Sequence, residues 1–192
     1  MTVLNAAVVL AQAPVDPITA PPISFSLTAP VLIALAGAVL GILFEAFLPR
    51  RVRYPVQVGL ALLTVGGALA WTLVGANRGD VGVTFGGALA VDSATYVMWG
   101  VLLVLALPSV LLMADRVSEP GGAFVAQAAA RIGSRRDRLA TRVAAPMQTE
   151  VFPLALFAVA GMMIFPAATD LVTLFVALEV LSLPLYLLCG LA

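Results

Sequence analysis

The sequence predicts an all-α integral membrane protein, a polytopic helical bundle with five transmembrane helices. Three observations carry this prediction. Of the 192 residues, 62% are hydrophobic and only 10% are charged. The mean hydropathy is +1.10. Five apolar runs are each long enough, or nearly so, to cross a hydrocarbon core of about 30 Å. A soluble domain of this length needs a more polar surface, so lipid is the expected solvent.

The predicted elements follow the apolar runs in chain order. They are a Pro-rich extracytoplasmic N-terminal segment at 1–25, three transmembrane helices within 26–114 at about 26–48, 55–75 and 93–114, an Arg-rich cytoplasmic loop at 115–150, and helices four and five within 151–192 at about 151–168 and 171–191. The N-terminal segment imitates a signal peptide but lacks a basic start, so we expect an extended lead-in and not a cleaved leader.

The arginines predict the orientation of the chain. Nine of the ten lie in the loops after the first and third spans, and only Arg78 lies between the second and third. Because basic loops stay in the cytoplasm, both Arg-rich loops are expected there, with the N-terminus outside. The expected location is a bacterial plasma membrane. The loop at 115–150 is interpreted equally as an amphipathic helix on the inner leaflet or as a solvated, partly disordered segment.

Composition excludes several kinds of chemistry. The formal net charge is zero, so we expect no nucleic-acid partner. The chain has no histidine, one cysteine (Cys189) and only arginine among its basic residues. Metal ligands and redox ligands are therefore scarce, and no cofactor or metal is expected in this chain.

Four further positions have local interpretations. Gly37 and Gly41 have the GxxxG spacing of a close helix–helix contact, with chance as an equal alternative. Glu45 is expected to reach the interface and meet the arginines of the next turn. Asp92 and Asp170 precede predicted helices, where capping is the default role.

The stretch LEVLSLPLYLL at 178–188 places Glu179 near the middle of the fifth apolar run. An ionised carboxylate at that depth costs roughly 2.5–3.5 kcal/mol, so the acid stays protonated or meets a cation or water. Either outcome makes its charge depend on its surroundings, as a catalytic proton relay requires. The alternative is a buried acid that merely hydrogen-bonds a neighbouring helix.

Three residues near Glu179 complete the candidate site. Ser182 and Tyr186 follow at i+3 and i+7, so they share a helical stripe with the acid and are candidate relay neighbours. A structural role is favoured for both, with Tyr186 as an interface anchor. Pro184 has no N–H to give to the carbonyl of Val180, and it predicts a local helix distortion where water or a hydroxyl enters.

The run at 149–188, with Glu150-Val151-Phe152-Pro153-Leu154 opening one helix and LEVLSLPLY in the next, resembles the NADH-quinone oxidoreductase subunit N family of respiratory complex I. The resemblance implies an antiporter-like fold of which this chain is the N-terminal portion. It also implies membrane-arm subunits as partners, and proton translocation coupled to electron transfer from NADH to quinone elsewhere in the complex. Glu179 would be the carboxylate that this family pairs with a lysine on a later helix. The alternatives are a subunit of a multi-subunit cation/proton antiporter and a non-transporting membrane scaffold.

Overall fold

The computed structural model describes residues 23–115 and 148–191. Most of the predicted N-terminal segment and of the Arg-rich loop lies outside the described residues. The helices are α2 (Phe25–Phe47), α3 (Arg50–Arg78), α4 (Ser93–Met113), α6 (Val151–Ile164) and α7 (Leu171–Leu191), with a 3₁₀ turn, η2 (Phe165–Ala167), between the last two.

The described part of the chain confirms the all-α membrane class. Four helices, namely α2, α3, α4 and α7, are long and apolar enough to cross a membrane, and the stretch Val151–Ala167 is a shorter apolar helix. Large apolar side chains cover the outside of the bundle, including Leu63 and Leu171 at 77% and 83% exposure. Such a surface is stable in lipid and not in water.

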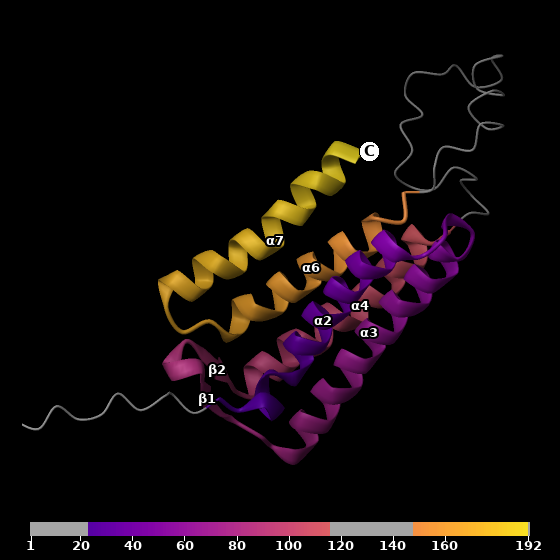
Figure 1. Ribbon diagram of the computed structural model, residues 1–192. Coiled ribbons are helices and arrows are strands. Elements are labelled where there is room, and N and C mark those ends of the chain that lie inside the picture. Colours follow the sequence, from indigo (N-terminus) through magenta and orange to yellow (C-terminus); the bar gives the residue numbers. More distant parts are fainter. Residues whose placement is uncertain (1–22, 116–147, 192) are drawn as a thin grey trace, which may run out of the picture.

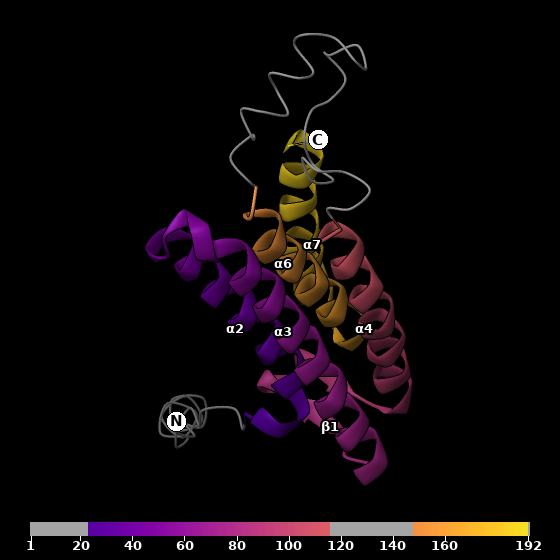
Figure 2. The same ribbon diagram turned by 90° about the vertical axis from the view of Figure 1, so that its right-hand side faces the viewer.

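The shortest helix occupies the centre of the bundle. Helix α6 packs against α2, α3, α4 and α7. Helices α2, α3 and α4 gather on one side of it, whereas α7 lies on the other side and packs chiefly on α6 (Figures 1 and 2). Helix α6 is therefore the element through which α7 is positioned relative to the rest.

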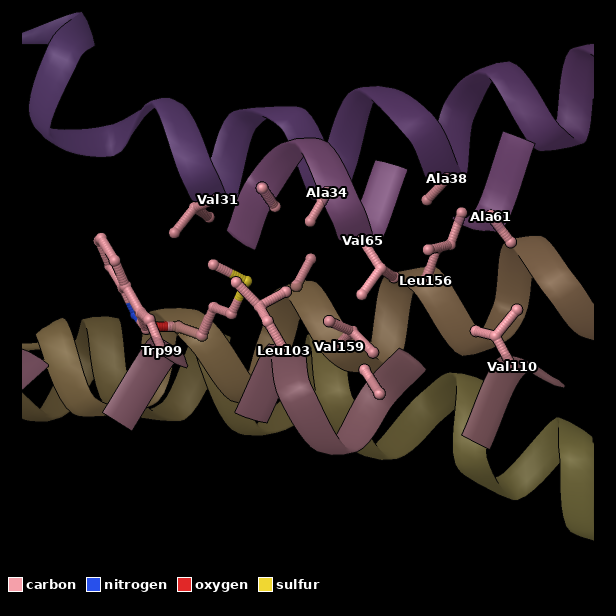
Figure 3. Close-up of a cluster of buried hydrophobic side chains, with 14 of the residues drawn as sticks. Val31, Ala34, Ala38, Ala61, Val65, Trp99, Leu103, Val110, Leu156 and Val159 are labelled. Atoms are coloured by element: carbon pink, nitrogen blue, oxygen red, sulfur yellow. The ribbon is translucent and has the colours of Figure 1, made fainter. Parts of the chain in front are cut away.

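The core between α2, α3, α4 and α6 is built mostly from small side chains, as Figure 3 shows. Ala34 and Ala38 of α2 and Ala61 of α3 are almost fully buried. Trp99 is the largest fully buried side chain, and its Nε1 donates a hydrogen bond to the carbonyl of Met163 at 2.6 Å. This bond ties α4 to the end of α6, where carbonyls lose their helical partners.

The predicted GxxxG contact is confirmed. A Cβ at Gly37 would collide with the side chain of Thr64 in α3, and one at Gly41 would lie 2.9 Å from the Cβ of Pro153 in α6. The two glycines therefore let α2 approach two neighbours closely, as small residues do between membrane helices.

One end of the bundle, called here the hairpin end, is closed by a β-hairpin that the apolar runs of the sequence did not indicate. Its strands are β1 (Gly82–Thr84) and β2 (Leu89–Val91), joined by the turn η1 (Phe85–Gly87). All three turn residues have positive φ, which glycine adopts readily at the last two positions.

The hairpin fastens the chain segments around it. The Ser24 N–H donates to Thr84 Oγ1 at 2.9 Å, and the Thr169 N–H donates to the carbonyl of Ala88 at 3.1 Å. Asp92 then caps α4 by accepting from the Thr95 N–H at 2.7 Å, which confirms the predicted cap. The start of α2 and the turn between α6 and α7 are thus held together at this end.

Candidate functional site

Glu179 lies at the ninth residue of α7, surrounded in sequence by apolar side chains. The helix starts where Asp170 accepts hydrogen bonds from the Thr173 N–H and hydroxyl, both at 2.8 Å, so the predicted cap at Asp170 is confirmed. These hydrogen bonds lower the pKa of Asp170, the backbone N–H most strongly. The cap fixes where α7 begins and hence the position of Glu179 along the helix.

The face that α7 turns toward α6 is defined by its buried residues, which are Ala177, Pro184 and Leu188. At about 100° per residue, Glu179 lies about 200° around the helix from Ala177. The acid therefore faces away from α6. It is half-buried, and no described residue makes a hydrogen bond or ion pair with it.

Ser182 and Tyr186 lie on the same broad face of α7 as Glu179, within about 60° and 20° of it by helical geometry. Ser182 is half-buried and Tyr186 is 71% exposed. No hydrogen bond joins either of them to Glu179 within the described residues. Glu179, Ser182 and Tyr186 therefore lie on one broad side of α7, the side that faces away from α6.

Pro184 is buried, on the opposite side of α7 from Glu179. Helix α7 continues through it to Leu191. The turn before it rests on Gly161 of α6, where an added Cβ would lie 2.9 Å from the carbonyl carbon of Val180 and 2.5 Å from the Leu181 nitrogen. The helical turn that lacks the proline N–H donor, at Val180 and Leu181, therefore contacts the α6 backbone at Gly161.

A second polar group, the Glu45 cluster (Glu45, Arg53, Gln57 and Thr149), lies at the opposite end from the hairpin. Arg53 Nη1 forms an ion pair with Glu45 Oε1 at 2.8 Å, which confirms the expected meeting of this acid with an arginine. Gln57 Nε2 and Thr149 Oγ1 donate to Glu45 Oε2 at 3.1 and 2.7 Å. Gln57 Nε2 also donates to the carbonyl of Gly41 at 2.7 Å.

This cluster joins α2, α3 and the start of α6, and we call this end of the bundle the arginine end. Sequence reasoning found Glu45 and Arg53 but missed Gln57 and Thr149. The signal available for Gln57 was a glutamine inside an apolar run, because a buried amide needs hydrogen-bond partners; the structure leaves it 1% exposed. Because both Glu45 oxygens already accept hydrogen bonds, the cluster functions as a structural tie.

No group of three or more histidine, cysteine or acidic side chains within 23–115 and 148–191 is arranged to hold a metal ion. The arrangement of polar groups in the described bundle therefore offers two features. One is the tied Glu45 cluster, and the other is the unpartnered stripe of α7 with Glu179 at its centre.

Several curated proteins are similar to this chain. It is 51% identical over 175 residues to the NADH-quinone oxidoreductase subunit N of Saccharopolyspora erythraea, an alignment that covers 90% of this chain and 34% of the relative. It is 52% identical over 172 residues to the protein of the same name from Salinispora arenicola, covering 90% and 33%. For the subunit N of Mycobacterium tuberculosis the identity is 47% over 190 residues, covering 90% and 36%.

No protein-family model matches the chain. The chain spans about a third of the length of the curated relatives it matches. Within that third, about half of all residues are identical in several relatives with one name. Over about 90% of its length, the chain is therefore similar to a portion of NADH-quinone oxidoreductase subunit N.

Proposed function

We propose that this chain is part of a proton-translocating membrane-arm subunit of NADH-quinone oxidoreductase, in which Glu179 takes up and releases protons. One observation carries the proposal. Glu179 is a carboxylate at the ninth residue of an apolar helix, it faces away from α6, on which α7 chiefly packs, and none of the described residues pairs with it. An acid in the middle of the membrane is costly, so its presence there is by default a sign of function.

The physical chemistry of such a position supports a relay. In apolar surroundings the charged form of a carboxylate is disfavoured, and a nearby cation reverses that preference. The resemblance to subunit N supplies a candidate cation, a lysine on a later helix of the subunit. The proton would then bind to Glu179 when the lysine is neutral and leave when the lysine is charged. No electron transfer occurs at this site, because NADH and quinone react elsewhere in the complex.

The proposed setting follows from the arginines. The arginine end lies in the cytoplasm and the hairpin end outside, in a bacterial plasma membrane. The other membrane-arm subunits and the bilayer are the partners. Helix α7 then runs from the outside inward, with Glu179 near the middle of the membrane.

The test replaces Glu179 in the full-length subunit within the assembled complex. Glu179→Gln removes the exchangeable charge at nearly constant volume, whereas Glu179→Asp keeps a carboxylate and is the matched control. In inside-out membrane vesicles supplied with NADH, we expect Glu179→Gln to lower both the proton-to-electron ratio and coupled quinone reduction, with partial recovery in Glu179→Asp.

The abundance of the complex is measured in the same vesicles, so that lost assembly is separated from lost proton transfer. Parent-level pumping by Glu179→Gln at parent-level abundance would contradict the proposal and favour a scaffold role.

A further inference from the structure

The contact between α6 and α7 at Gly161 differs in kind from the glycine contacts of α2. A Cβ added at Gly161 would lie nearest to three main-chain atoms, the nitrogen and Cα of Leu181 at 2.5 and 2.8 Å and the carbonyl carbon of Val180 at 2.9 Å. At Gly37 and Gly41 the nearest atom belongs to a side chain instead. Two main chains are therefore in direct contact at Gly161, and no side-chain rotation can change their separation.

This main-chain contact is made by the two residues that directly follow Glu179 in the chain. Hydrogen bonds within a helix hold neighbouring residues in fixed relative positions, at a rise of about 1.5 Å per residue. The place of the main chain at Val180 and Leu181 therefore determines where the Cα of Glu179 lies. A reacting side chain is positioned only as well as the backbone that carries it.

Helix α6 is a fixed support for this contact because the rest of the bundle holds it on several sides. It packs against α2, α3 and α4 as well as α7. Two residues after Gly161, the carbonyl of Met163 accepts a hydrogen bond from the fully buried Trp99. Just before the start of the helix, the Thr149 hydroxyl donates to Glu45. The position of Gly161 is thus set by three helices other than α7.

Helix α7 depends on packing for its own position. Ala177 is fully buried on the side that faces α6, and Pro184 and Leu188 are buried there as well. Within the described residues, no side chain of α7 forms a hydrogen bond with another helix. The separation of α6 and α7 beside Glu179 is therefore set by van der Waals contact, and at Gly161 that contact is between main chains.

The turn that contacts Gly161 is also the turn that α7 holds least firmly by itself. Pro184 has no N–H to donate to the carbonyl of Val180, so one hydrogen bond of the helix is absent there. Contact with Gly161 supports this turn from outside at the carbonyl carbon of Val180. A change at the glycine is therefore transmitted to the part of α7 that carries the acid.

We propose that Gly161 is a positioning residue for the proposed proton relay. By bringing the two main chains into contact directly beside Glu179, it sets the place of the carboxylate relative to the groups with which it exchanges protons. The glycine exchanges no proton and acts only through Glu179. The inference rests on the proposed function of Glu179. Such positioning matters because a misplacement of about 1 Å costs a reaction up to about 10²-fold in rate.

The test compares Gly161→Ala with Gly41→Ala in the full-length subunit within the assembled complex. The Cβ at Gly161 has to increase the separation of α6 and α7 by about 0.9 Å, from 2.5 Å to ordinary contact at 3.4 Å. The Cβ at Gly41 would lie 2.9 Å from the Cβ of Pro153, so the control crowds α6 equally against α2 and not against α7. In inside-out vesicles supplied with NADH, the pumping rate is measured per assembled complex across a range of pH.

The pH profile distinguishes positioning from a merely structural role. Lost assembly lowers the abundance of the complex and moves neither the rate per complex nor its pH profile. For a charge about 4 Å away, at an effective dielectric constant of about 20, a displacement of 0.9 Å moves a titration by up to about half a pH unit. Helix α6 and η2 contain no titratable residue, and α7 contains only Tyr186 and Cys189 besides Glu179.

For Gly161→Ala we expect about a tenfold lower pumping rate per complex, with a moved pH profile. For Gly41→Ala we expect the parent rate and the parent profile. An unmoved profile in Gly161→Ala, at any rate of pumping, would overturn the proposal. An equal movement in Gly41→Ala would overturn it as well, because crowding anywhere on α6 would then have the same effect.

A smaller displacement covers the case in which Gly161→Ala does not assemble. Ala177→Ser adds one atom on the same side of α7, two residues before Glu179, at a position with 0% exposure. We expect it to move the pH profile too, by less than the alanine at 161, and a parent profile in this variant would contradict the proposal.

A double variant separates this inference from the proposed function. If Gly161 acts through Glu179, adding Gly161→Ala to Glu179→Gln should lower the pumping rate per complex no further, and two independent losses would show that the glycine acts elsewhere. If Glu179→Gln alone pumps at the parent rate, the relay itself is wrong. If Glu179→Gln impairs pumping while Gly161→Ala keeps the parent pH profile, the relay stands and the positioning role is wrong.

Discussion

Replacing Gly161 with alanine tests the contact that positions the helix of Glu179. The added Cβ would lie 2.5 Å from the nitrogen and 2.8 Å from the Cα of Leu181. Ordinary van der Waals contact begins at 3.4 Å, so α7 has to retreat from α6 by about 0.9 Å at this point. Both obstructing atoms belong to the backbone, so rotation of a side chain cannot relieve the clash.

The cost follows from two opposing effects. Overpacking of this kind costs up to about 3 kcal/mol, whereas alanine gains about 1 kcal/mol over glycine within a helix. We therefore expect a net loss of about 2 kcal/mol. The unfolding midpoint should therefore fall, by less for each kcal/mol than the about 2–4 °C of a 150–250-residue domain, because the relatives' full-length subunit is about three times as long as this chain.

The assay heats membranes that contain the assembled complex and measures by immunodetection how much of the subunit stays soluble in mild detergent. Gly66→Ala is the matched control, because a Cβ at Gly66 meets nothing within 4 Å. Its midpoint should equal or exceed that of the parent, since only the helical preference of alanine changes. If Gly161→Ala melts together with Gly66→Ala, α6 and α7 do not meet at this glycine as described.

Two further predictions use the same heating assay. Glu45→Ala leaves the buried Thr149 hydroxyl without its acceptor, at a cost of about 1–3 kcal/mol, while the partly exposed Arg53 pair adds at most about 1 kcal/mol. Thr149→Val removes the same hydrogen bond from its other side. The double variant Glu45→Ala/Thr149→Val should therefore lose less stability than the two single variants lose together, and strict additivity would contradict the shared bond. For Asp170→Ala, hydrogen bonds from Thr173 lower the folded-state pKa of Asp170 from 3.8, so the cap stabilises α7 above that pH and its contribution disappears as the pH falls through the lower folded-state value. The difference in midpoint between parent and variant should therefore shrink below pH 3.8, and an equal difference at neutral and acidic pH would show that the carboxylate is not the cap.

Local chemistry was visible in the sequence wherever both partners lie close in the chain. Asp92 with Thr95 and Asp170 with Thr173 are three residues apart, and the caps followed from residue type and position. The pairing of Glu45 with Arg53 also spans only one short turn. In each case the interaction needs no knowledge of how helices pack.

Apart from the close helix contact at Gly37 and Gly41, the sequence did not indicate which distant segments meet. Gln57 and Thr149 reach Glu45 from 12 and 104 residues away, and nothing local to either residue indicates that meeting. The β-hairpin was missed for a similar reason, because its short strands depend on bonds to Ser24 and Thr169. Helix α3 begins at Arg50, five residues before the predicted span, since hydropathy marks the part of a helix in lipid and not its polar first turn.

The direction in which Glu179 faces also could not come from the sequence. Helix α7 is apolar nearly all round, so its pattern does not indicate which side packs against the bundle. Gly161, far away on α6, selects that side by admitting the α7 backbone at Val180 and Leu181. The position of the acid along the helix was predictable, and its direction around the helix was not.

The shortness of α6 gives the centre of the bundle a shorter apolar path than α2 has. Its 14 residues extend about 21 Å, and the three residues of η2 add about 6 Å, against about 35 Å for the 23 residues of α2. Helix α6 with η2 is therefore shorter than a bilayer interior of about 30 Å. Its polar ends lie closer to the middle of the bundle than the ends of α2 do. A charge that moves along α6 therefore has a shorter apolar distance to cross than one that moves along α2.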